Sequence, residues 1–113
     1  MAITISEQGE VTIVEVRNDI TSETVDEFKE ILEHLAELPQ RRVVMDLTEV
    51  NYLCSSGLAI IGKSLHRILD QGGKMAVAGG QRRVLRLFAM TRLSDLLPCH
   101  ATKEEALQGV QLP

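Results

Sequence analysis

The chain has 113 residues, of which 44% are hydrophobic and 25% are charged, and this fits one globular domain. Its formal net charge of −4 argues against a nucleic-acid partner. No apolar run approaches the roughly 18–20 residues of a membrane-spanning helix, and the first five residues lack the basic and apolar regions of a signal peptide. We therefore expect a single domain over residues 1–113, cytoplasmic and without direct membrane insertion.

The N-terminal residues predict a β-hairpin followed by a helix. Residues 3–5 alternate, Gly9-Glu10 provides a turn, and residues 11–16 are rich in β-branched side chains. Thr21 or Ser22 is expected to cap the first helix, which Pro39 ends. The apolar residues of this helix recur at helical spacing: Val25, Phe28, Ile31, Leu32, Leu35 and Leu38.

The middle of the chain predicts a buried strand and a second helix. Residues 43–47 form a largely apolar run, which is typical of a strand covered on both faces. The second helix is expected to begin at Ser55-Ser56, with Ser55 as the better cap, and to stop at Gly72-Gly73. Its apolar stripe consists of Leu58, Ile61, Leu65, Ile68 and Leu69.

The second half continues the alternation of strands and helices. We expect a strand over residues 74–78, a flexible turn at Gly79-Gly80, a helix over about residues 82–90 and a short strand at Leu96-Leu97. Thr102 is expected to cap a last helix. The order predicts an α/β fold: a mixed, mostly parallel sheet of four to five strands, with about four helices packed on it.

The serine pair Ser55 and Ser56 is the most informative feature. It follows a buried strand and opens a helix, where unpaired backbone N–H groups favour negative charge. A serine at this position can be a plain cap, or it can be a switch, since a phosphate there changes the charge without breaking the helix.

Other reactive residues form no catalytic or metal-binding pattern. Cys54 and Cys99 lack C-x-x-C spacing and are expected to be reduced, and Ile60 stands where a cysteine-phosphatase loop needs arginine. His34, His66 and His100 have no metal-ligand spacing, and no G-x-S-x-G motif is present. We expect no enzymatic activity, no cofactor and no metal ion.

Four arginines gather around the third predicted helix: Arg82, Arg83, Arg86 and Arg92. Such a cluster is usually a solvated face. Alternatively, it contacts an acidic partner or holds a phosphate.

The stretch Met45–Leu58, with Asp46-Leu47-Thr48 and then Cys54-Ser55-Ser56-Gly57-Leu58, resembles the STAS domain of the anti-sigma-factor antagonist family. The stretches Gln71–Met75 and Val84–Thr91 resemble the second half of that domain. The resemblance covers almost the whole chain and implies a single STAS domain.

The resemblance implies a phosphorylation-regulated binding protein. Its phosphoacceptor would be Ser56, modified by an anti-sigma factor with serine kinase activity and restored by a phosphatase. The unphosphorylated form would bind the anti-sigma factor and release a sigma factor for transcription. Four residues would support the serine (Ser55, Gly57, Thr21 and Cys54), and four would contact the partner (Asp19, Ile20, Ser22 and Leu58).

This chain departs from the family pattern at two positions near the serine. The family usually has aspartate where Cys54 and Thr21 stand here. These departures leave two alternatives open, a STAS subunit of a lipid-transport ATPase complex and a scaffold in a stress-signalling assembly.

Overall fold

A computed structural model describes residues 2–39 and 41–111 of the chain. Four helices, one 3₁₀ helix and five strands occupy these residues. In chain order they are β1 (Ile3–Gln8), β2 (Val11–Val16), α1 (Val25–Ala36), β3 (Arg42–Asp46), α2 (Ser55–Asp70), β4 (Lys74–Ala78), α3 (Arg82–Met90), η1 (Leu93–Asp95), β5 (Cys99–His100) and α4 (Lys103–Gln111).

The five strands form one mixed sheet in the order β1-β2-β3-β4-β5. β1 pairs with β2 antiparallel through the hairpin, and every other neighbouring pair is parallel. In the centre of the sheet, Met45 lies between Val14 and Val77. The predicted mixed, mostly parallel α/β sheet with about four helices is confirmed.

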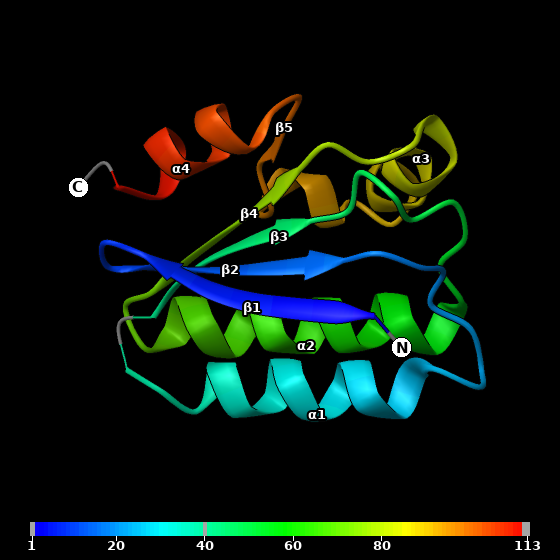
Figure 1. The fold of residues 1–113 in the computed structure, drawn as a ribbon, viewed down its shortest axis with the longest axis horizontal. Helices are drawn as coiled ribbons and strands as arrows, with labels where there is room; N and C mark the ends of the chain where they lie inside the picture. The colour runs from blue at the N-terminus through cyan, green and yellow to red at the C-terminus, as the bar shows by residue number, and fades with distance from the viewer. Residues whose placement is uncertain (1, 40, 112–113) are drawn as a thin grey trace.

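Alternation along the strands gives the sheet two apolar faces of unequal size. Val14, Met45 and Val77 belong to the larger core, which also contains the apolar faces of α1, α2 and α3. Their sequence neighbours Ile13 and Val44 belong to a smaller core beneath α4. Figure 1 shows α1 and α2 below the sheet and α4 above it. Central strands covered on both sides account for the apolar run over residues 43–47.

The N-terminus of α1 differs from the prediction. The helix begins at Val25 after Thr24, so Thr21 and Ser22 are not its caps. Thr21 instead lies in a turn of its own, where its Oγ1 accepts a hydrogen bond from the Glu23 N–H at 3.2 Å. The Thr24 Oγ1 accepts from the Thr21 N–H at 2.9 Å, and these bonds close the chain into a turn before the helix.

The predicted strand at Leu96-Leu97 is wrong. The chain forms η1 just before these residues, and the last strand is β5, paired with Val77 and Ala78 of β4. Leu97 is fully buried because it fills the larger core, without pairing in the sheet. Thr102 caps α4 as expected, accepting from the Glu105 N–H at 3.2 Å.

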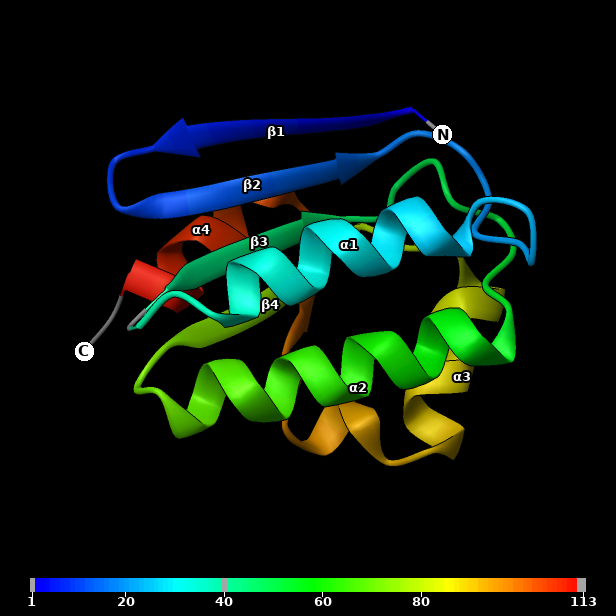
Figure 2. The ribbon, with the colours of Figure 1, turned by 90° about the horizontal axis from the view of Figure 1, so that it is seen from below.

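The carboxyl ends of β2, β3 and β4 meet at one edge of the sheet, because parallel strands end on the same side. The loops that follow them lead into α1, α2 and α3, and Figures 1 and 2 show the starts of these helices gathered there. In open α/β sheets this edge is the usual place for a functional site.

Candidate functional site

The loop before α2 is bound tightly to the loop before α1. The Ile20 N–H donates to the Tyr52 carbonyl at 3.0 Å, and the Cys54 N–H donates to the Ile20 carbonyl at 2.9 Å. The Asp19 Oδ1 accepts from the N–H groups of Asn51 and Tyr52, at 2.8 and 3.1 Å. These four bonds fix where α2 begins.

Cys54 directly precedes α2 and has extended backbone angles. Its backbone carbonyl accepts a hydrogen bond from the Leu58 N–H at 3.0 Å. Ser55 is therefore the first helical residue and not the cap that was predicted. The Cys54 side chain makes no capping hydrogen bond, and the first turn of α2 contains no acidic residue. The first N–H groups of the helix remain available to an anion.

Ser56, the second residue of α2, is exposed to solvent, as is Ser55. The Ser56 hydroxyl lies 3.3 Å from the Cys54 thiol. Gly57 is buried, and a Cβ there would lie 2.8 Å from the Leu53 Cδ1 and 2.9 Å from the Ile20 Cγ2. Glycine lets the helix approach the loop closely while the serine before it faces water.

Ser56 also lines a groove of about 810 Å³ between α1 and α2. Figure 2 shows the two helices side by side across the sheet. The charged and titratable side chains that α1 contributes to the groove are of both signs: Asp26, Lys29 and Glu33. Those that α2 contributes are all basic: Lys63, His66 and Arg67. Apolar and small residues line it as well: Val25, Ala36, Ala59, Ile60 and Ser64.

The residues expected to contact a partner have different environments. The Asp19 carboxylate is engaged by the loop N–H groups, and Ser22 is exposed. Ile20 is fully buried, so its side chain supports the loop from inside and offers a partner no surface. Leu58 is partly buried against the larger core. Among the described residues, Thr21 makes hydrogen bonds only within its own turn.

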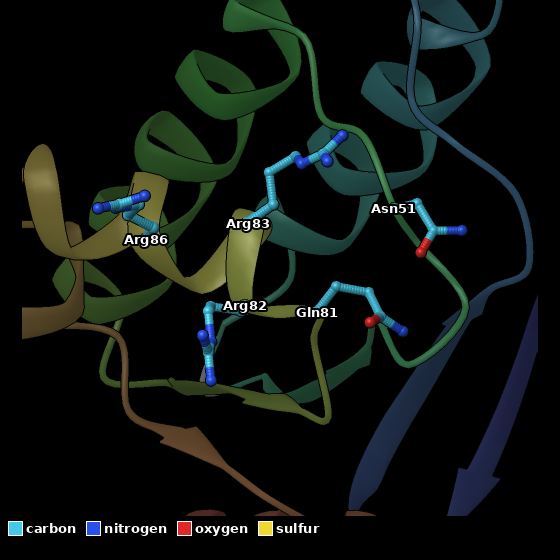
Figure 3. A pocket seen from close by; sticks show the side chains of 5 residues that line it. All are labelled: Asn51, Gln81, Arg82, Arg83 and Arg86. Carbon is cyan, nitrogen blue, oxygen red and sulfur yellow. The ribbon is translucent and has the colours of Figure 1, made fainter.

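A second cavity, of about 510 Å³, lies at the same edge of the sheet (Figure 3). We call it the arginine pocket, after its lining: Asn51, Gln81, Arg82, Arg83 and Arg86. The charge cluster on α3 was visible in the sequence. The place of Asn51 in the pocket was not visible, because only the fold brings this residue, 30 positions earlier in the chain than Gln81, next to α3.

Within the part of the chain that is described, no group of three or more histidine, cysteine or acidic residues is arranged to hold a metal ion. Both cysteines are free thiols. Burial raises the pKa of the Cys99 thiol, which disfavours its reactive thiolate form. None of the described helices combines the length and apolar character needed to cross a bilayer.

The family model of the STAS domain matches residues 2–106 of the chain. Among curated proteins, the anti-sigma-B factor antagonist of Listeria monocytogenes is 30% identical over 82 residues, which are 73% of this chain and 72% of that protein.

Solved structures share the fold at lower identity. An anti-sigma factor antagonist from Mycobacterium paratuberculosis superimposes with a TM-score of 0.86 and 23% identity, over 98% of this chain and 94% of that one. The Bacillus cell fate determinant SpoIIAA in its phosphorylated form gives a TM-score of 0.76 and 13% identity, over 96% and 99% of the two chains. At these identities the likeness concerns the sheet and its helices.

Proposed function

This chain belongs to the STAS domain family, and on that premise we propose that it is an anti-sigma-factor antagonist controlled by phosphorylation of Ser56. The name of its Listeria relative supports the antagonist role. The proposed partner is an anti-sigma factor with serine kinase activity. A phosphatase removes the phosphate again, and both reactions take place in the cytoplasm. The chain itself contributes binding and not catalysis.

The observation that carries this proposal is the exposed Ser56 hydroxyl at the uncapped start of α2. A kinase needs a hydroxyl that it can reach. The phosphate adds about −1.5 to −2 charges at pH 7 and three acceptor oxygens. At a helix N-terminus this charge is stabilising, typically by about 0.3–1 kcal/mol, so the domain stays folded when modified.

The partner, by contrast, cannot bury that charge. Ser56 and Ser22 are both exposed and uncharged, and a protein can cover such side chains at little desolvation cost. A phosphate within the same contact would need a cation from the partner, and burying an anion without one is costly. Phosphorylation would therefore release the partner.

Cys54 and Thr21 are uncharged, in contrast to the aspartates that the family pattern usually has at these positions. Since the first turn of α2 has no acidic residue either, the unphosphorylated start of this helix carries no negative side chain of its own. The thiol beside the serine hydroxyl, at 3.3 Å, also avoids the repulsion that a carboxylate would exert on an incoming phosphate.

The test uses the full chain and each serine-kinase anti-sigma factor of the source organism. The purified chain is incubated with the kinase and ATP, and the peptide containing Ser55 and Ser56 is analysed by mass spectrometry. We expect one phosphate, at Ser56, that is absent in Ser56→Ala and retained in Ser55→Ala. Binding without phosphate transfer would retain the antagonist role and remove the switch. Neither binding nor transfer would favour the transporter-subunit or scaffold alternative.

A further inference from the structure

The groove between α1 and α2 opens on the side of the two helices that faces away from the sheet. Buried or partly buried residues form its floor, namely Val25, Ala36, Ile60 and Ser64. Exposed charged side chains stand above them, and in Figure 2 no other described element lies over the space between the two helices. An open, partly apolar channel between two helices is a shape that further helices can fill.

The two walls of the groove carry charges that no ion pair neutralises. The α1 wall consists of Asp26, Lys29 and Glu33, and the α2 wall of Lys63, His66 and Arg67. Within the described part of the chain, none of these side chains forms an ion pair. The walls lie on opposite sides of the groove, and their charges remain available to a molecule that enters it.

The two helices differ in the sign of their excess charge. α1 carries four carboxylates and one lysine, whereas α2 carries Lys63 and Arg67 against a single carboxylate, that of its last residue Asp70. A partner with one uniform charge would be repelled by one of the two walls. A second copy of this chain, in contrast, presents an acidic and a basic helix side by side.

The topology allows the two copies to match these charges. α1 and α2 run in the same direction, because each connects two parallel strands of the sheet. A two-fold axis along the groove therefore places α1 of each copy on α2 of the other, so that acidic and basic helices meet twice. An axis across the helices would place α1 on α1, where the carboxylates repel each other. Charge complementarity thus selects the first arrangement.

We infer that this groove is the interface of a weak two-fold dimer of the chain, in which α1 of each copy packs on α2 of the other. The 16 residues of α2 span about 24 Å, and two helices about 10 Å apart give a face of roughly 500 Å² per copy. This is less than the roughly 800 Å² per partner of a standard interface, so we expect dissociation constants of about 10–100 µM. The inference concerns the unmodified chain alone and stands independently of the Ser56 switch.

Sedimentation equilibrium of the full chain, from about 5 µM to about 1 mM, tests the dimer. We expect a monomer–dimer equilibrium that added salt shifts toward the monomer. Glu33 and Lys63 are each the ninth residue of their helix and so lie at similar heights along the groove. Glu33→Lys or Lys63→Glu should weaken the dimer about tenfold, because each change acts at two contacts of the dimer. The double variant should recover association, since its pairs re-form with the signs exchanged.

Glu30→Lys is the matched control, because Glu30 is an exposed carboxylate of the same helix outside the groove lining. It should leave the dissociation constant unchanged, and circular dichroism of every variant should show an intact fold. The inference is overturned if the chain stays monomeric throughout, which would leave the groove to a different protein. It is also overturned if Glu30→Lys weakens the dimer as much as Glu33→Lys, if the double variant does not recover, or if the amide NMR signals that move on dilution lie outside α1 and α2.

Discussion

The starts of α2 and α3 are built alike and carry opposite chemistry. Each helix follows a loop after a parallel strand, and each is preceded by a residue in an extended conformation, Cys54 or Gln81. Neither has a side-chain cap or an acidic residue in its first turn. Yet α2 opens with two uncharged serines, whereas α3 opens with two arginines.

The comparison shows how the first residues of a helix can give one architecture two different electrostatic characters. An uncapped helix start favours an anion. At α2 the anion would arrive covalently, as a phosphate on a hydroxyl. At α3 the two arginines instead add fixed positive charge to the same kind of helix start. Four pairs of substitutions test the two helix starts and the contacts that support them.

The largest effect is expected at Ser56. Ser56→Asp places a permanent negative charge in the proposed contact and should weaken anti-sigma-factor binding at least about 100-fold, or about 2.7 kcal/mol. Isothermal titration calorimetry measures it. Ser55→Asp, one position away, should weaken binding much less, and equal losses would contradict a specific role for Ser56.

The next effect concerns the support of the α2 start. Asp19→Ala removes the acceptor for the Asn51 and Tyr52 N–H groups and should lower the free energy of unfolding by about 2 kcal/mol. Asp19→Asn keeps an oxygen acceptor and should lose less. Urea denaturation of both variants decides the point, and identical stability of Asp19→Ala and wild type would refute the pinning role.

Glycine has opposite roles at two positions of α2. Gly57→Ala should destabilise the chain by about 1 kcal/mol, because the new methyl group meets the side chains of Leu53 and Ile20. At Gly62 the nearest atom is 3.7 Å away, so Gly62→Ala should stabilise the helix by about 0.5–1 kcal/mol. Thermal denaturation measures both variants. If Gly57→Ala and Gly62→Ala shifted the melting temperature in the same direction, close packing would not explain the glycine at position 57.

The smallest effect is expected at α3. Arg83→Glu should raise the free energy of unfolding by about 0.3–1 kcal/mol, because an acidic residue suits the helix start. Arg67→Glu, in the last turn of α2, should lower it by a similar amount. Equal melting temperatures at low salt for these two variants would remove the argument that the arginines oppose the stability of α3.

The sequence predicted the features that depend on local pattern. The strand over residues 74–78, the start of α2 at Ser55 and the helix over residues 82–90 follow from apolar runs, helical spacing and the glycine pairs. The STAS resemblance was likewise carried by one continuous stretch, and the family match confirms it.

Features that depend on specific side-chain hydrogen bonds or on the packing of the folded chain were beyond these patterns. The start of α1 is delayed to Val25 by hydrogen bonds that Thr24 makes with Thr21 and Asp19. Leu97 looked like part of a strand because a buried side chain leaves the same apolar signal in either structure. The Ser56 groove and the arginine pocket combine residues from separate helices or loops, which no spacing along the chain reveals.

The account rests on Ser56 as a charge switch that acts on binding and leaves the fold intact. Its most direct test compares the affinity of the cognate anti-sigma factor for the chain before and after stoichiometric phosphorylation, together with the melting temperature of each form. We predict at least a 100-fold loss of affinity with a melting temperature that is unchanged or slightly raised. Equal affinity of the two forms, or a loss of affinity that accompanies unfolding, would contradict the account.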